Sequence, residues 1–217
     1  MTAAEPLPTN ADLRADLDHP DPTVRMRAAR IFCDREDAQA IPRLTELLRD
    51  PCLLVRVSAA YALGRNSDPT TVPMLIATFQ QDWNGYVRKG VVWAMGNAQD
   101  AAALPVLASA VLDDIVAVRL WAASALGQLG ARVGNASNLQ HPIQALVTAL
   151  QRDPVAAVRS NCAWALGQLH DIFADPRLMP ILESVREALA HVRDEDSDLA
   201  VQDDAQQALK KLSWELT

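Results

Sequence analysis

A Val-Arg pair that returns at intervals of 31 to 43 residues limits this chain to a small set of folds. Around the middle four pairs, an Asp stands five residues earlier and a Gly stands nine residues later. Repeats of this length are typical of solenoids, in which each unit buries its apolar face only by stacking on its neighbours. The repeated pair stands at Val24-Arg25, Val55-Arg56, Val87-Arg88, Val118-Arg119 and Val158-Arg159, with a degenerate sixth copy at Val201-Gln202.

Each unit is predicted to contain two helices, the second of which carries the Val-Arg pair. The steps Asp50-Pro51 and Asp153-Pro154 are predicted to begin second helices, with Asp as the N-cap and Pro at the first helical position. The first helix of each unit is predicted to open at a proline, because the missing N–H of proline would be unpaired there anyway. These prolines are Pro42, Pro73, Pro105, Pro142 and Pro180.

A turn of about 100° per residue divides the second helix into faces. The stripe that starts at the anchor valine is apolar and is predicted to face the core. A neighbouring stripe carries Arg, Ala and Gly, although glycine inside a helix costs about 1 kcal/mol relative to alanine. The recurring glycines therefore predict the close approach of an adjacent helix, with a helix end as the alternative. The core stripe around Val118 is Val118, Ala122, Ala125, Leu126 and Leu129, and the glycines are Gly64, Gly96, Gly127 and Gly167.

The expected fold is all-α, a right-handed α-solenoid of about six helix pairs in a single array over residues 1–217. The segment Gly130–His141 is about nine residues longer than the matching turn elsewhere and is predicted either to contact a partner or to form a plain long loop. The helix from Pro180 is predicted to extend to about Arg193. The predicted boundaries are 1–12 for the tail and the start of a capping helix, 13–40, 41–71, 72–103, 104–141 and 142–176 for five repeats, and 177–217 for a C-terminal capping repeat.

The pattern Asp…Val-Arg-x-x-Ala-Ala-x-Ala-Leu-Gly resembles HEAT repeats, and within these the phycobilisome-lyase-like repeats of cyanobacteria. That group includes the E/F-type bilin lyases and related proteins that are not lyases. The resemblance covers residues 13–212, and the segments NGYVRKGVVWAMGN and AVRLWAASALGQLG resemble a small member linked to iron–sulfur assembly and phycobiliprotein maturation. It implies a structural ladder of Arg25, Arg56, Arg88, Arg119 and Arg159 with Asp50, Asp82, Asp113, Asp153 and Asp196.

The resemblance also implies that the second helices line a concave groove. Positions two, three, six and ten after each anchor valine would then face a partner, and the aromatic row among them is typical of an interaction surface. The alternative is that these rings only cover neighbouring second helices. The candidate partner-binding residues are Tyr61, Arg65, Trp93, Asn97, Trp121, Gln128, Trp164, Gln168, Arg27, Arg30 and Lys89.

The N-terminal half of this predicted groove is basic, with Asp34 as its single acid, whereas Asp203 and Asp204 lie at its C-terminal end. A basic patch in an acidic protein suggests an acidic partner, or the propionate or carboxylate groups of a ligand, and an ordinary solvated face is the alternative. The net charge of −7 argues against a nucleic-acid partner, because phosphate contacts need clustered Lys and Arg.

Enzymatic or metal-binding motifs are not found in the sequence. Cys33, Cys52 and Cys162 are scattered, so we expect neither a disulfide framework nor a metal site, although Cys52 is the first thiol to consider for contact with a cluster or a bilin. The adjacent pair His170-Asp171 gives no catalytic geometry. We expect no cofactor, no signal peptide, no membrane span and a cytoplasmic protein.

The sequence therefore favours a non-enzymatic scaffold or assembly chaperone that holds another protein in its groove. The resemblance suggests phycobiliprotein or phycobilisome biogenesis, with a phycobiliprotein subunit or an iron–sulfur scaffold as the partner. Two alternatives remain, a subunit of a bilin lyase or isomerase and an iron–sulfur cluster assembly partner.

Overall fold

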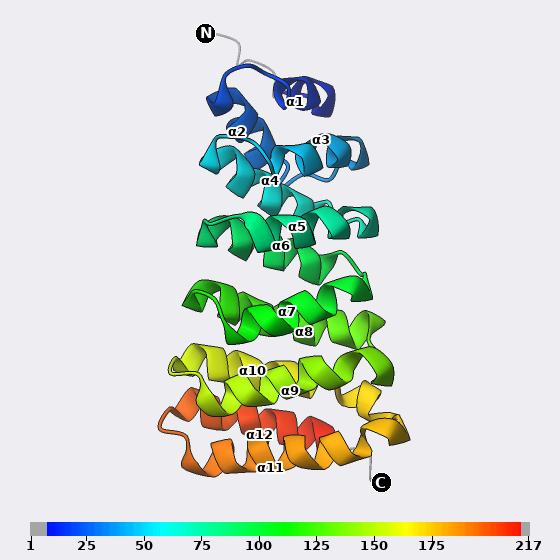
Figure 1. The fold of residues 1–217 in the computed structure, drawn as a ribbon, viewed down its shortest axis with the longest axis vertical. Coiled ribbons are helices and arrows are strands. Elements are labelled where there is room, and N and C mark those ends of the chain that lie inside the picture. The colour runs from blue at the N-terminus through cyan, green and yellow to red at the C-terminus, as the bar shows by residue number, and fades with distance from the viewer. Residues whose placement is uncertain (1–7, 214–217) are drawn as a thin grey trace, which may run out of the picture.

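The helix pairs of this chain follow one another along a single long axis in the computed structural model, which describes residues 8–213 (Figure 1). Within those residues the chain forms twelve α-helices and five short 3₁₀ helices, and no strand. The α-helices are α1 Asn10–Asp16, α2 Pro22–Ile31, α3 Ile41–Leu47, α4 Leu53–Arg65, α5 Val72–Gln81, α6 Gly85–Asn97, α7 Leu104–Leu112, α8 Val116–Val133, α9 Ala136–Arg152, α10 Ala156–Gln168, α11 Met179–Glu195 and α12 Leu199–Ser213; the 3₁₀ helices are Ala38–Ala40, Pro69–Thr71, Ala101–Ala103, His170–Ala174 and Pro176–Leu178.

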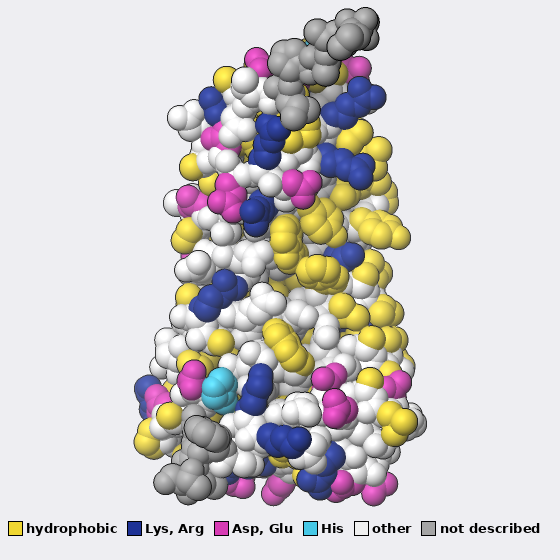
Figure 2. All heavy atoms as spheres, turned by 180° about the vertical axis from the view of Figure 1, so that it is seen from behind, with side chains coloured by type: hydrophobic (Ala, Val, Ile, Leu, Met, Phe, Trp, Pro, Cys, Tyr) yellow, Lys and Arg dark blue, Asp and Glu magenta, His cyan; other side chains and the backbone are white. Residues whose placement is uncertain are grey.

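The even-numbered helices form one layer of the stack and the odd-numbered helices form the other. Each even helix from α2 to α10 packs directly on the next even helix, whereas α3 and α5 pack mainly on the even helices and α7 packs on both α8 and α9. The even helices are therefore the tighter, inner layer in this part of the stack. Figure 2 views the molecule from their side. The predicted all-α solenoid of helix pairs is confirmed; residues 1–7 of the predicted tail lie outside the described residues.

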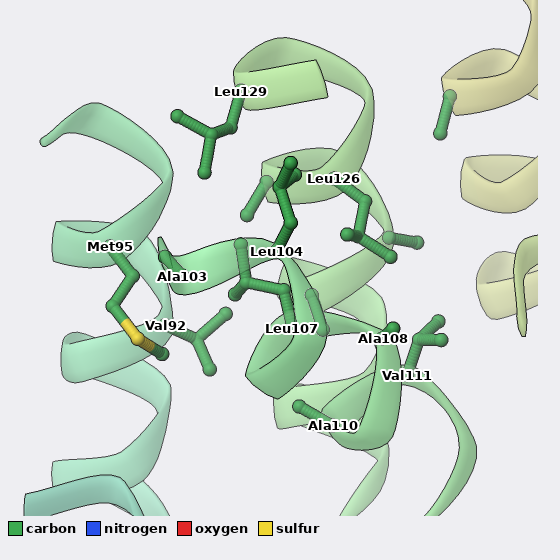
Figure 3. Packing of buried hydrophobic residues seen from close by; sticks show 14 of the residues in the cluster. Val92, Met95, Ala103, Leu104, Leu107, Ala108, Ala110, Val111, Leu126 and Leu129 are labelled. Atoms are coloured by element: carbon green, nitrogen blue, oxygen red, sulfur yellow. The ribbon is translucent and has the colours of Figure 1, made fainter. Parts of the chain in front are cut away.

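The core lies between the two layers and is continuous through the stack. Figure 3 shows Leu104 and Leu107 of α7 among Val92 and Met95 of α6 and Leu126 of α8. The predicted core stripe of α8 is confirmed, because its five residues are at most 6% exposed.

The helical glycines lie where consecutive even helices meet. A Cβ added at Gly127 would stand 2.8 Å from the Cα of Ala165 on α10, and one at Gly96 would stand 2.8 Å from the Cβ of Ala125 on α8. Both distances are shorter than van der Waals contact. The prediction of close helix approach is confirmed. Gly127 lies in the middle of α8, whereas Gly64, Gly96 and Gly167 are each the next-to-last residue of a helix.

A ladder of ion pairs joins the turns along one edge of the stack. Each ladder arginine donates from Nε and Nη2 to the carboxylate of the next unit, at 2.6–3.4 Å. Its Nη1 donates to a backbone carbonyl just before its own helix, as in Arg56 to Asp50 and Arg159 to Asp153. Gln202 keeps the equivalent bond to the carbonyl of Asp196 without the charge. The pairs are Arg25–Asp50, Arg56–Asp82, Arg88–Asp114, Arg119–Asp153 and Arg159–Asp196.

The assignment of Asp113 to this ladder is wrong, because its neighbour Asp114 pairs with Arg88. Asp113 is exposed at the end of α7. The Asp114 carboxylate accepts the N–H of the very next residue, Ile115, whereas Asp50 accepts the N–H two residues on, from Cys52. The ladder carboxylate in this turn therefore lies one residue nearer to the start of the second helix.

The predicted N-caps at Asp50 and Asp153 are also wrong. The helices α4 and α10 begin three residues later, with Cys52 and Val155 in the N-cap positions. Each aspartate instead accepts the N–H of the residue two positions on while its carboxylate pairs with the arginine of the preceding unit. The carboxylate thus fixes the turn and the contact between units together.

The segment Gly130–His141 is mostly helical rather than a long loop. The helix α8 continues to Val133, and α9 begins at Ala136, so that Pro142 lies inside α9 instead of opening it. Asn135 and Asn138 form a reciprocal capping box that begins α9 early. The predicted extension of the helix after Pro180 is confirmed, since α11 reaches Glu195.

We predict that Asp114→Ala lowers the free energy of unfolding by about 2–3 kcal/mol, because it leaves the largely buried Arg88 without its carboxylate. The neighbouring exposed substitution Asp113→Ala is the control and should change stability by less than about 0.5 kcal/mol. Urea denaturation followed by circular dichroism measures both. Equal effects of the two substitutions would contradict the ladder register.

We also predict that Gly127→Ala destabilises the chain. Alanine gains about 1 kcal/mol in helix propensity, but overpacking against the backbone of Ala165 costs about 1–3 kcal/mol. The same denaturation experiment should show a lower urea midpoint, with the exposed Gln128→Ala in the same helix close to wild type. A Gly127→Ala chain more stable than wild type would show that the even helices are not in tight contact.

Candidate partner-binding face

Four aromatic side chains lie on successive even helices, one per helix. Tyr61, Trp93, Trp121 and Trp164 belong to α4, α6, α8 and α10, and each is half-buried, so part of every ring remains open to solvent. Figure 2 shows hydrophobic side chains gathered in the middle of the even-helix side. We call the surface formed by these four residues and their even-helix neighbours the aromatic face.

Three of the four rings form one cluster. The ring centroids of Tyr61 and Trp93 are 5.8 Å apart with a tilted geometry, and those of Trp93 and Trp121 are 6.5 Å apart, edge to face. Edge-to-face and tilted contacts are favourable arrangements for aromatic rings. The cluster therefore joins α4, α6 and α8 into one preformed apolar surface.

Small residues make room for this cluster. A Cβ added at Gly64 would collide with the Trp93 ring at 2.2 Å, and one at Gly90 would stand 3.4 Å from the Tyr61 ring. Both rings thus lie across the neighbouring even helix. This agrees with the alternative prediction that the aromatic rings cover neighbouring second helices. Because both residues are only half-buried, each covers the adjacent helix and is still partly accessible to solvent.

A cation lies against the cluster. The ammonium Nζ of Lys89 is 5.3 Å from the centroid of the Trp121 ring, within the range of a cation–π interaction. Lys89 is half-buried and precedes Trp93 by four residues on α6. The charge is therefore held at the centre of the apolar surface rather than at its margin.

Trp164 stands apart from the cluster and takes part in a polar contact. The amide of Gln168 is best oriented with its oxygen toward Trp164 Nε1 at 3.2 Å and Lys211 Nζ at 2.8 Å, and it accepts from both. At the same end, Asp204 accepts a hydrogen bond from the hydroxyl of Ser160. The C-terminal end of the aromatic face is thus more polar than its middle.

The predicted basic end is present but carries one more acid than expected. Arg27 and Arg30 are exposed on α2, as is Asp34 just beyond it. Arg65, however, pairs with Glu36 at 3.1 Å, and the sequence analysis had not placed Glu36 at this end. The excess of positive charge here therefore rests on Arg27, Arg30 and Lys89.

The two remaining predicted polar residues differ in their surroundings. Asn97 is half-buried, and its Nδ2 donates to the backbone carbonyl of Gly64 at 3.2 Å, which links α6 to α4. Gln128 is exposed on α8. Asn97 thus has a structural contact already, whereas Gln128 is available to a partner.

The thiols offer little for metal or bilin chemistry. Burial raises the pKa of Cys33 to about 11 and also raises the pKa of the fully buried Cys162. A raised pKa keeps a thiol protonated, although the thiolate is the nucleophile and the metal ligand. Cys52 is half-buried at the start of α4. Across residues 8–213, no three His, Cys, Asp or Glu side chains come together as a metal site would require.

The sequence analysis missed a second group of apolar side chains, which lies at the ladder edge. Trp83 in the turn before α6 is 78% exposed, and Tyr86 in the first turn of α6 is 67% exposed. Leu54 in the first turn of α4 and Ile115 at the N-cap of α8 are also exposed. A depression of about 320 Å³ beside Trp83 includes Arg56 and Asp82 of the ladder. The sequence signal for this group was Trp83, which follows the ladder residue Asp82 at the position that Pro51 takes after Asp50 in another copy.

No helix in the described part of the chain combines the length and apolar character that crossing a bilayer requires.

Comparisons with known structures agree on the architecture. An engineered protein is 23% identical to this chain over 96% of it and 100% of its own length, with a TM-score of 0.72. A designed armadillo repeat protein in complex with the peptide (KR)4 is 21% identical, over 92% of this chain and 98% of its own, with a TM-score of 0.67. The complex of CpcE and CpcF of phycocyanin lyase from Nostoc sp. PCC7120 matches 100% of this chain and 91% of the other, at 21% identity and a TM-score of 0.60.

Family models locate the same repeats in the sequence. None of the curated proteins has a significantly similar sequence. The family model described as PBS lyase HEAT-like repeat matches residues 158–191. The model for HEAT repeats matches residues 10–94 and 72–167, which is more than half of the chain. The chain therefore belongs to the HEAT repeat family.

Proposed function

We propose that this chain is a non-enzymatic scaffold or assembly chaperone of the cytoplasm that holds apolar surface of another protein on its aromatic face. The observation that carries this proposal is the preformed cluster of Tyr61, Trp93 and Trp121. These half-buried residues lie on three consecutive even helices, α4, α6 and α8. Ordered aromatic rings lose little conformational entropy on binding and are frequent energetic anchors of protein interfaces.

The partner that we propose is a phycobiliprotein subunit before its assembly. The match of residues 158–191 to the PBS lyase HEAT-like repeat supports this choice, as does the similarity in fold to the phycocyanin lyase complex of CpcE and CpcF. Unassembled subunits expose apolar surface, and covering it would hold them soluble until their own partner arrives. The aromatic cluster would bind that surface reversibly.

The test measures binding to purified apo-phycocyanin subunits by isothermal titration calorimetry. Trp93→Ala combined with Trp164→Ala should weaken binding by about 100-fold or more, because each truncated anchor costs about 2 kcal/mol. Helicity measured by circular dichroism should be retained. The matched control is Trp83→Ala, which removes the same side chain from the ladder edge and should leave the affinity unchanged.

Two outcomes separate the levels of this proposal. Unchanged affinity of the double variant would show that the aromatic face is not the binding surface. If apo-subunits do not bind, but affinity capture from the native host followed by mass spectrometry finds another protein that needs both tryptophans, the scaffold role holds and the phycobiliprotein assignment is wrong.

A second candidate function is a subunit of a bilin lyase or isomerase. It is favoured by the same repeat match and by the lyase complex among the similar folds. After the purified chain is mixed with bilin and free pigment is removed, the protein should then retain visible absorbance that passes to an added apo-subunit. A colourless protein would contradict the lyase function, and the scaffold would then be the remaining proposal. The iron–sulfur assembly alternative gains no support from the thiols, two of which have a raised pKa.

A further inference from the structure

The cations of the aromatic face lack the ion pairs that most arginines in the described residues form. The five ladder arginines, and also Arg14, Arg43, Arg65, Arg177, Arg186 and Arg193, each lie within ion-pair distance of a carboxylate. Among residues 8–213 nine cations form no such pair: Arg27, Arg30 and Lys89, and also Arg35, Arg49, Arg132, Arg152, Lys210 and Lys211. Of these nine, Arg27, Arg30 and Lys89 are the ones that flank the aromatic cluster on α2 and α6. The chain has a net charge of −7 and so has carboxylates in excess. These three cations therefore stand ready for a carboxylate that another molecule brings.

Their placement follows the order of the helices. Arg27 and Arg30 lie on α2, Lys89 lies on α6, and α4 with Tyr61 packs between them. Packed helices are about 8–10 Å apart, so the two cationic groups are separated by about 16–20 Å along the stack. Between and beside them lie the rings of the aromatic cluster. The face therefore alternates positive charge, apolar surface and positive charge.

Lys89 is the most constrained of the three. One side of its ammonium is held by the Trp121 ring at 5.3 Å, and the residue is half-buried. A partly desolvated cation gains more from a carboxylate than a fully hydrated one does, because its surroundings have a lower effective dielectric constant. The ring orients the ammonium but does not neutralise it.

Resting on the proposed function, we propose that the partner of the aromatic face is an acidic and apolar segment of a protein. Its apolar side chains would cover the cluster, with carboxylates at one end over Arg27 and Arg30 and a second carboxylate over Lys89. A separation of about 16–20 Å corresponds to about 11–13 residues of α-helix, or about 5–6 residues of extended chain.

The neighbouring charges are consistent with this placement. Asp34 and Glu36 also lie at the basic end. Glu36 is paired with Arg65, so Asp34 is the acid that faces Arg27 and Arg30, and two positive charges stand against one negative charge there. Toward the other end, Asp203 is exposed and Asp204 is bonded to Ser160. Carboxylates of a partner would therefore be attracted over α2 to α6, where Arg27, Arg30 and Lys89 lie.

The experiment uses two synthetic 20-residue peptides rich in leucine and phenylalanine. One peptide carries two clusters of aspartate 12 residues apart, and the other carries two clusters of lysine at the same positions. Fluorescence anisotropy against the full-length chain at low salt should show roughly tenfold tighter binding of the aspartate peptide. In Arg27→Glu with Arg30→Glu, this preference should vanish or reverse. The matched control, Arg49→Glu with Arg152→Glu, makes the same charge change at exposed positions beside the ladder edge and should keep the preference.

The outcomes distinguish this inference from the proposed function. Equal binding of both peptides, lost in the Trp93→Ala and Trp164→Ala variant, would overturn the acidic partner while keeping an apolar binding face. A control variant that loses the preference as fully as the Arg27 and Arg30 variant would show an effect of overall charge and would also overturn it. The inference would also be overturned if neither peptide binds but a single-stranded oligonucleotide does, and if that binding is lost in the variant with Arg27→Glu and Arg30→Glu.

Discussion

The contact between consecutive even helices is the constraint on which the rest of this structure depends. Glycine and alanine at that contact bring the helices together without intervening side chains, as at Gly127 and Ala165 or Gly96 and Ala125. Because the even helices are this close, the side chains that point away from the contact form one continuous surface. At Gly64 the same absence of a side chain admits the ring of Trp93. A structural requirement of the stack thus creates the platform for the aromatic face.

The arginine–aspartate ladder complements that contact by fixing the register of the units. Each arginine reaches forward to the carboxylate of the next unit and back to a carbonyl of its own, so one side chain ties three segments together. Guanidinium groups suit this role because their planar array of donors can bind a carboxylate in two places. At Asp196, the opposing effects on the pKa are a hydrogen bond from Arg159, which lowers it, and burial, which raises it; the net pKa is lowered, as expected for a carboxylate that stays charged.

The binding proposal and the structural role of the aromatic rings are compatible. A ring that lies across a neighbouring helix is ordered before a partner arrives, so binding need not restrict it further. The ammonium of Lys89 is likewise ordered before a partner arrives, because the Trp121 ring holds it in place. Arg27, Arg30 and Lys89, which form no ion pair within the described residues, lie on the same even-helix side as the aromatic cluster.

Periodicity in the sequence determined the helix pairs, the core stripe and the side of the second helix on which the tryptophans lie. These features are local or repeat in every unit, so spacing alone specifies them. The choice between Asp113 and Asp114 depended on which carboxylate met Arg88 of the preceding unit. The start of α9 before Pro142 depended on a local capping box of Asn135 and Asn138. Whether Tyr61, Trp93 and Trp121 would touch, and which cations would remain unpaired, only the tertiary structure decided, because both depend on distances between helices that one sequence does not contain.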